Sequence, residues 1–186
     1  MDMDAQISYV HRQPSLLYAA LQRADDPKIN RVLHSHDKIC ELVFVNVGEG
    51  CYILNGRSYP IYPGDFLFSN QGDLHEVQSA THREIGTICF GIEGLELKGL
   101  PPGCFTEAKD GYIRPVGRMY EQIKNLCQLM YNQMELGTAQ SRDIAQHLFL
   151  ALLPLALSFP ADDRNEAQTE SVMLVNRIGQ YIAAHF

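Results

Sequence analysis

Three histidines and one glutamate carry the clearest chemical signal in this 186-residue sequence. His34 and His36 stand two residues apart, Glu41 begins an apolar run five residues later, and His75 follows a glycine turn further along the chain. Imidazole and carboxylate are common protein ligands of transition metals such as Zn, Ni, Fe and Mn. Adjacent strands that brought these four side chains together would form a metal site with one coordination position left open.

Strand geometry sets a condition on this cluster. His34 and His36 face the same side of a regular strand because side chains alternate, whereas Glu41 has the opposite parity. Glu41 can therefore join the two histidines only if the chain bends at residues 37–38, where Asp and Lys allow it.

The strand that begins at Glu41 predicts part of a pocket lining. Val43 and Val45 share the face of Glu41, so this carboxylate is expected to point into an apolar interior. Aromatic residues on the neighbouring runs are further candidates, although such residues belong more often to a core. The full set expected around a bound small molecule is His34, His36, Glu41, Val43, Val45, Tyr52, Phe66, Phe68 and His75.

Three interpretations of the His/Glu cluster stay open on the residues alone. The cluster binds a divalent transition metal, or its members are hydrogen-bonded polar groups of the fold without a metal, or it binds the carboxylate or hydroxyl of an effector directly. In each case Glu41 needs a partner, because burying an unpaired carboxylate is costly.

The residues around the cluster predict an antiparallel β-barrel. Short runs rich in Val, Ile, Phe and Tyr alternate with Gly, Asn and Asp through residues 31–93. Asn55-Gly56 between two apolar runs indicates a two-residue hairpin turn with positive φ at both positions. Many short strands without intervening helices are typical of a sandwich or small barrel. We expect the barrel over residues 31–114, after an N-terminal arm with edge strands over residues 1–30.

Two antiparallel helices are expected after the barrel, over residues 115–157. Apolar residues recur at three- and four-residue steps up to Gly137, which ends the first helix, and Thr138 can cap the second. Packing both helices on the barrel would leave surface for a partner subunit. We expect a homodimer interface at Met119, Ile123, Leu126, Met130, Met134, Leu148 and Leu152.

The last part of the sequence has a different character. Residues 158–170 are polar and acidic, which is typical of a linker. Residues 171–186 have the apolar spacing of one more helix. We interpret this helix as the beginning of a further domain that is cut off.

Composition and charge argue against nucleic-acid binding and against a membrane-spanning segment in this chain. A net charge of −7 argues against a nucleic-acid-binding surface on this chain, because phosphate binding needs clustered Lys and Arg. No apolar run is long enough to span a bilayer, and the N-terminus lacks the apolar core of a signal peptide. Five scattered cysteines without a CxxC pair suit a reducing compartment, so a cytoplasmic location is expected.

The motifs resemble those of the cupin superfamily. Residues 34–48 (H-x-H-x4-E-x6-G) are similar to the first cupin motif and residues 64–75 (G-x5-N-x-G-x2-H) to the second. Asn70 stands where cupins usually have proline, and Ser79 stands where they usually have asparagine. All four metal-ligand positions of the superfamily are filled here, whereas these two supporting positions differ.

The order of the elements narrows the resemblance to the amino-terminal domain of AraC-type transcription regulators. In that family a ligand-sensing cupin barrel is followed by two helices that supply the dimer contact. The sequence VNRIGQYIAAHF resembles the first helix of the family's helix-turn-helix domain, and the whole resemblance covers about residues 30–186.

This resemblance implies an effector-sensing and dimerisation domain rather than an enzyme. It also implies that DNA is contacted only through a carboxy-terminal domain outside this sequence. The alternative is a metal-dependent cupin enzyme of the dioxygenase or isomerase type, which the complete His-His-Glu-His set favours.

Overall fold

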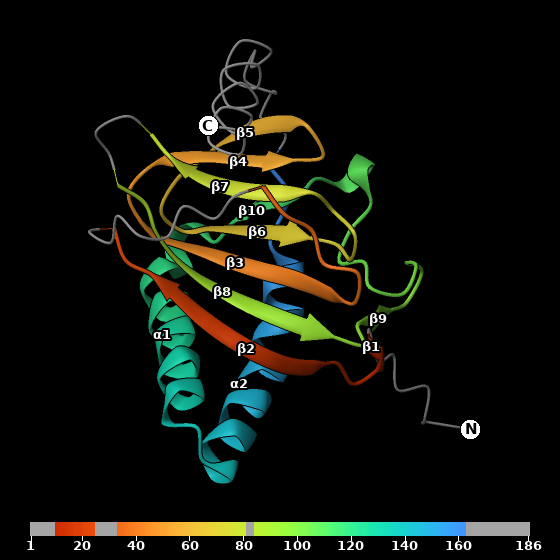
Figure 1. Cartoon of the computed structure of the whole chain (residues 1–186), viewed down its shortest axis with the longest axis vertical. Helices are drawn as coiled ribbons and strands as arrows, with labels where there is room; N and C mark the ends of the chain where they lie inside the picture. The colour runs from red at the N-terminus through yellow and green to blue at the C-terminus, as the bar shows by residue number, and fades with distance from the viewer. Residues whose placement is uncertain (1–9, 25–32, 81–83, 163–186) are drawn as a thin grey trace, which may run out of the picture.

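Two antiparallel sheets and a pair of helices make up most of the computed structural model, which describes residues 10–24, 33–80 and 84–162 (Figure 1). The five-stranded sheet consists, in spatial order, of β10 (Ile113–Pro115), β6 (Asp65–Ser69), β3 (Ile39–Val47), β8 (Gly86–Glu93) and β2 (Ser15–Gln22). The three-stranded sheet consists of β5 (Arg57–Ile61), β4 (Gly50–Leu54) and β7 (His75–Ser79). A two-stranded sheet joins β1 (Val10–Arg12) to β9 (Glu96–Leu97).

Local turns form where the sequence predicts them. Asn55 and Gly56 have φ values of 49° and 84°, and they connect β4 to β5 as a hairpin. The chain bends at residues 37–38, directly before β3, which confirms the break needed to turn Glu41 toward the histidines. The antiparallel cupin-type barrel followed by two helices is thereby confirmed as the fold class.

An inner core lies between the two sheets. Because side chains alternate along a strand, Val43, Val45 and Leu67 of the five-stranded sheet face inward. They pack in one hydrophobic cluster with Tyr52 and Leu54 of the three-stranded sheet. Because Glu41 shares its face of β3 with Val43 and Val45, it points toward this inner core.

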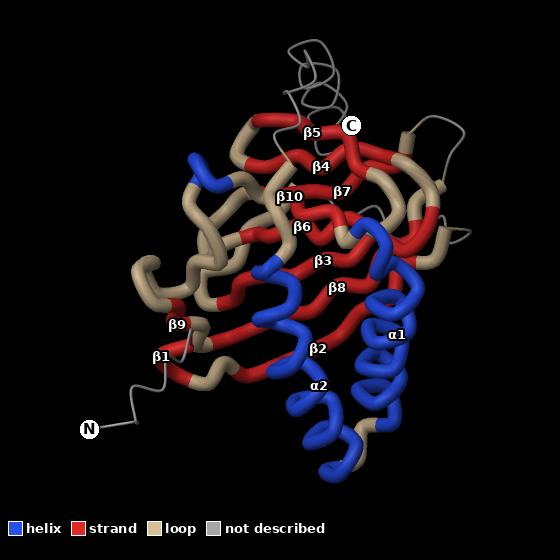
Figure 2. The backbone as a smooth tube through the Cα atoms, turned by 180° about the vertical axis from the view of Figure 1, so that it is seen from behind, coloured by secondary structure: helices blue, strands red, loops and turns tan. Residues whose placement is uncertain are grey.

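The opposite face of the five-stranded sheet is covered by the helices α1 (Tyr120–Leu136) and α2 (Ala139–Ser158) (Figure 2). Gly137 ends α1 in the left-handed conformation, and the Thr138 hydroxyl accepts a hydrogen bond from the Ser141 amide, so both predicted helix boundaries are confirmed. Two short 3-10 turns, η1 (Ala108–Asp110) and η2 (Gly117–Met119), precede α1.

Two of the predicted pocket residues belong to the helix side of the sheet. Phe66 and Phe68 pair with Phe44 and Leu42 across β3, and all four lie in the outer core beneath the helices. Leu67, between them, faces the inner core instead. Phe66 and Phe68 therefore face the helices rather than the inner core that Glu41 faces, and the sequence pattern does not distinguish the two faces of β6 because both are buried.

The helices bury several residues that the sequence assigned to a dimer interface. Ile123, Met130 and Leu152 are at most 1% exposed and pack in the outer core of the same chain. These three side chains therefore pack against the sheet of their own chain, which leaves little of them to contact a partner subunit. Of the remaining interface candidates, Leu126, Met134 and Leu148 are partly buried and Met119 is 37% exposed.

The segment between the barrel and the helices contains two short strands, β9 and β10, that the sequence pattern did not indicate. Within residues 94–114, β10 pairs with β6 and extends the five-stranded sheet. The helix expected at 171–186 and most of the expected linker lie outside the described residues. Among the described helices, none combines the length and apolarity needed to cross a membrane.

Burial should decide which cysteines react. Burial raises the pKa of Cys40 to about 12 and raises the pKa of Cys127 far above its ordinary range, and Cys89 is fully buried. Cys51 and Cys104 are only partly buried. Because the thiolate is the nucleophile, we expect iodoacetamide at pH 8 to alkylate the native protein only at Cys51 and Cys104. Peptide mapping would check this, and alkylation of native Cys127 would contradict it; urea should expose all five thiols.

Candidate metal and effector site

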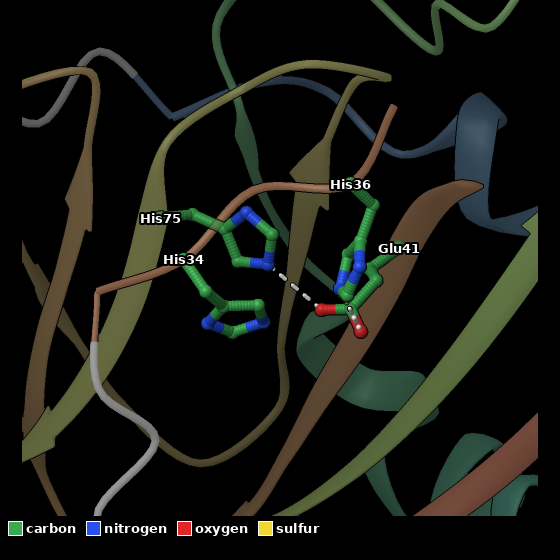
Figure 3. Close-up of side chains that lie close together, drawn as sticks. All are labelled: His34, His36, Glu41 and His75. Carbon is green, nitrogen blue, oxygen red and sulfur yellow. Dashed lines mark hydrogen bonds and ion pairs between the residues drawn. The ribbon is translucent and has the colours of Figure 1, made fainter. Parts of the chain in front are cut away.

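The His/Glu cluster forms where the two sheets meet. His34 pairs with His75 through two backbone hydrogen bonds of 3.1 and 2.8 Å, and this bridge joins the segment before β3 to the first residue of β7. Glu41 comes from β3 in the five-stranded sheet. Figure 3 shows the three imidazole rings gathered around the Glu41 carboxylate. The structure therefore brings together all four residues that the sequence singled out.

The distances within the cluster suit a single small cation. The candidate ligand atoms of the four residues all lie within 4.8 Å of one another. His75 Nε2 is 2.9 Å from Glu41 Oε2, and His36 Nε2 is 3.4 Å from Glu41 Oε1. The ring centroids of His34 and His75 are 4.5 Å apart.

Burial gives the cluster a closed side and an open side. Glu41 is 2% exposed and His75 is 3% exposed, whereas His34 and His36 are half-buried. The half-buried histidines therefore form the more exposed side of the cluster, and Glu41 and His75 form its buried side.

The two ring nitrogens of His75 have different partners, and these contacts favour a proton or a cation between His75 and Glu41. His75 Nδ1 is 2.9 Å from the carbonyl oxygen of Asp73, and a proton on Nδ1 would donate to that carbonyl. Nε2 then holds a lone pair that faces Glu41 Oε2 at 2.9 Å, which is unfavourable unless a proton or a cation lies between them.

His36 provides the second observation that fits a cation. Its Nε2 atom is buried and makes no hydrogen bond within the described part of the chain, although it faces the cluster. A buried polar atom without a hydrogen bond is unfavourable. A metal bound by this set would supply a Lewis-acid centre at which an effector oxygen can bind, and the donor types suit borderline cations.

Asp73 fixes the position of His75, and the sequence did not single it out. Its Oδ1 accepts a hydrogen bond from the Asn55 side-chain Nδ2 at 2.7 Å, and its Oδ2 accepts one from the backbone N–H of Asn70 at 2.8 Å. The Leu74 amide donates to Asn55 Oδ1 at 2.9 Å. The hairpin turn at Asn55 thus holds the backbone carbonyl that orients His75, and such supporting contacts tune metal affinity.

The two positions that depart from the cupin motifs have structural partners. Asn70 Oδ1 accepts a hydrogen bond from the Phe105 amide at 2.8 Å, and Asn70 Nδ2 donates to the Thr106 carbonyl at 3.0 Å. The Ser79 hydroxyl accepts a hydrogen bond from the Ile85 amide at 3.2 Å. Both side chains therefore stabilise neighbouring loops.

Tyr18 on β2 is a further residue that contacts the cluster. Its hydroxyl donates a hydrogen bond to Glu41 Oε1, on the side of the carboxylate away from His75. The sequence carries no signal for this contact, because Tyr18 lies in a segment interpreted as an arm and reaches Glu41 only through strand pairing.

The remaining predicted pocket residues lie in the inner core. Val43, Val45 and Tyr52 are each at most 1% exposed there. The Tyr52 hydroxyl lies 2.7 Å from Ser69 Oγ and donates to the Phe68 carbonyl at 3.0 Å, and burial raises its pKa well above the ordinary value. This hydroxyl already has partners within the core.

Comparison with known proteins identifies relatives over most of the chain. The HTH-type transcriptional activator RhaR of Klebsiella pneumoniae is 27% identical over 146 residues, which cover 75% of this chain and 52% of that protein. RhaR of Escherichia coli K12 is 26% identical over 155 residues, which cover 81% of this chain and 55% of that protein. The chain therefore spans about half the length of the curated relatives it matches.

Solved structures match a smaller part of the chain. A predicted oxalate decarboxylase from Thermotoga maritima is 28% identical, with a TM-score of 0.32, over 33% of this chain and 53% of that one. A cupin protein from Bacteroides fragilis is 22% identical, with a TM-score of 0.34, over 38% of this chain and 60% of that one. The assignment to a family rests instead on the sequence model of the AraC-like ligand binding domain, which matches residues 16–153.

That match includes Tyr18, the four residues of the His/Glu cluster and most of the helical pair. The chain belongs to the family of AraC-like ligand binding domains.

Proposed function

We propose that this domain binds a small polar effector at the His/Glu cluster and thereby controls a DNA-binding domain in the full-length regulator. The observation that carries the proposal is the convergence of four metal- and oxygen-binding side chains, buried Glu41 and His75 with half-buried His34 and His36, in a ligand-binding-domain family. The match to helix-turn-helix activators over half their length supports the control of a DNA-binding domain.

The chemistry of the cluster favours an effector with a hydroxyl or carboxylate group. Glu41 accepts hydrogen bonds, and each imidazole either donates or accepts according to its protonation. A Zn, Ni, Fe or Mn ion held by the four side chains would bind such an oxygen directly. The described residues include all five cysteines and contain no disulfide, which supports a reducing, cytoplasmic location for the regulator.

Strand β2 offers a physical connection from the cluster to the helical pair. Gln146 on α2 accepts a hydrogen bond from the Leu16 amide at 2.8 Å and donates one to the Pro14 carbonyl at 2.8 Å. Tyr18, two residues after Leu16, contacts Glu41. A ligand that displaces β2 would therefore act on α2, provided that it binds the two arrangements with different affinities.

The helical pair is also the proposed dimer contact. Leu129 is 45% exposed, Ile144 is 41% exposed and Met119 is 37% exposed, although each carries a large apolar side chain. A second copy of the chain that packed on α1 and α2 would remove these side chains from water.

Thermal shift measurements with a panel of monosaccharides, hydroxy acids and catechols would test the function. A true effector at 100 times its Kd should stabilise the protein by about 2.7 kcal/mol. This stabilisation should disappear in the variant Glu41→Gln and persist in the variant Glu93→Gln, which changes an exposed carboxyl on β8. Equal stabilisation of all three proteins would contradict binding at the cluster.

The same compounds distinguish a sensor from a cupin enzyme. Metal-loaded protein should leave a stabilising compound chemically unchanged, as followed by NMR over hours. Consumption of the compound that depends on Glu41 would instead establish the enzyme alternative, which the complete His/Glu set keeps relevant.

A further inference from the structure

Three residues on neighbouring strands form a row that ends at the His/Glu cluster. Tyr18 on β2 is paired with Gly91 on β8, and Gly91 is paired in turn with Glu41 on β3. The Tyr18 side chain crosses the middle strand at Gly91, and its hydroxyl donates a hydrogen bond to Glu41 Oε1.

Gly91 is the residue that permits this crossing. A Cβ atom at position 91 would lie 2.1 Å from Tyr18 Cε1 and 2.2 Å from Cζ, closer than any real contact. The φ angle of Gly91 lies outside the left-handed region, so its backbone conformation does not require glycine. Glycine in the middle of a strand weakens the sheet and often marks a close approach by another group. Here the approaching group is the Tyr18 ring.

The Tyr18 hydroxyl fixes how Glu41 presents its two oxygens. Oε1 accepts from Tyr18, while Oε2 faces His75 Nε2 at 2.9 Å. A carboxylate held at one oxygen cannot rotate freely about its terminal bond. It therefore keeps the other oxygen directed at the position shared with the histidines.

We propose that Tyr18 is a positioning residue of the candidate metal site and that Gly91 is glycine in order to admit its ring. The inference deepens the proposed function, on whose binding cluster it rests. Residues that hold a metal-binding carboxylate by hydrogen bonds typically contribute 10–100-fold to metal affinity.

A purely structural role makes a different prediction, and one substitution separates the two. If the ring of Tyr18 only covers Gly91 and stabilises the sheet, the variant Tyr18→Phe keeps that contact and should behave like the wild type. If the hydroxyl positions Glu41, this variant should keep its stability and lose metal affinity.

Titration of the untagged protein with Co²⁺ provides the test, with Kd and the visible absorption spectrum as readouts. We expect Tyr18→Phe to raise the Kd by roughly 10–100-fold and to change the spectrum, with little change in the urea midpoint. Gly91→Ala should raise the Kd similarly, because the added methyl group displaces the ring. The control Tyr112→Phe removes a hydroxyl from a side chain that packs on the same inner core and should match the wild type.

An unchanged Kd and spectrum in Tyr18→Phe would overturn the proposal, whatever Gly91→Ala does. Absence of Co²⁺ binding by the wild type would also overturn it. That second outcome leaves the sensor function standing if an organic compound still stabilises the protein through Glu41, so the two failures are distinguishable.

Discussion

Replacing His75 with alanine is expected to abolish metal binding and to destabilise the fold. His75 supplies a ligand atom and is also a direct partner of Glu41 Oε2, with both side chains almost fully buried. Removing the partner of a buried carboxylate oxygen leaves that oxygen unsatisfied and costs roughly 1–3 kcal/mol. Native mass spectrometry of untagged protein would report the metal, and urea unfolding at pH 7 would report the stability.

Two further variants make this result interpretable. His147→Ala removes an exposed histidine on α2 and should retain both metal and stability. His75→Gln keeps a polar side chain that can donate to Glu41, so it should recover part of the stability without the metal. A stoichiometric metal retained by His75→Ala would show that the cluster is not the metal site.

A large loss of stability is also expected on shortening Leu152. The sequence analysis placed this residue in a dimer interface, whereas the structure buries it completely within one chain. Leu152→Ala should lower the free energy of unfolding by about 2–5 kcal/mol, because it leaves a cavity in the outer core. The control Leu136→Ala shortens a side chain that is 65% exposed and should change stability by less than about 0.5 kcal/mol.

Protein concentration separates core packing from a subunit interface. If Leu152 belongs to the core of each chain, the loss of stability should be the same at low and high protein concentration. A loss that vanishes in dilute solution, together with a shift from dimer to monomer by light scattering, would place Leu152 between subunits.

Much of the candidate site could be predicted because its signals are local. The ligand types, the bend at residues 37–38 and the hairpin at Asn55-Gly56 each depend on a few consecutive residues. Gly137 and Thr138 likewise marked the helix boundaries through their own backbone and side-chain preferences. These features fixed the order of the elements, from which the family resemblance followed.

The face of each buried strand could not be predicted in the same way. Alternation divides β6 and β3 into two faces, but both faces are apolar and buried, one against the second sheet and one against the helices. Phe66 and Leu67 therefore look equivalent in sequence, and the helices decide which of them lies in the outer core. The same ambiguity affected the helices, where Met119 and Ile123 both belong to the predicted interface set, yet Met119 is 37% exposed and Ile123 is 1% exposed.

The sequence by itself determined which residues can do chemistry here, His34, His36, Glu41 and His75, and that short antiparallel strands carry them. Only the tertiary structure decided that Tyr18 and Asp73 support them. Tyr18 is 23 residues from Glu41, and they meet because β2 and β3 both pair with β8 at Gly91. Strand register of this kind depends on packing across the whole sheet, which no short stretch of sequence encodes.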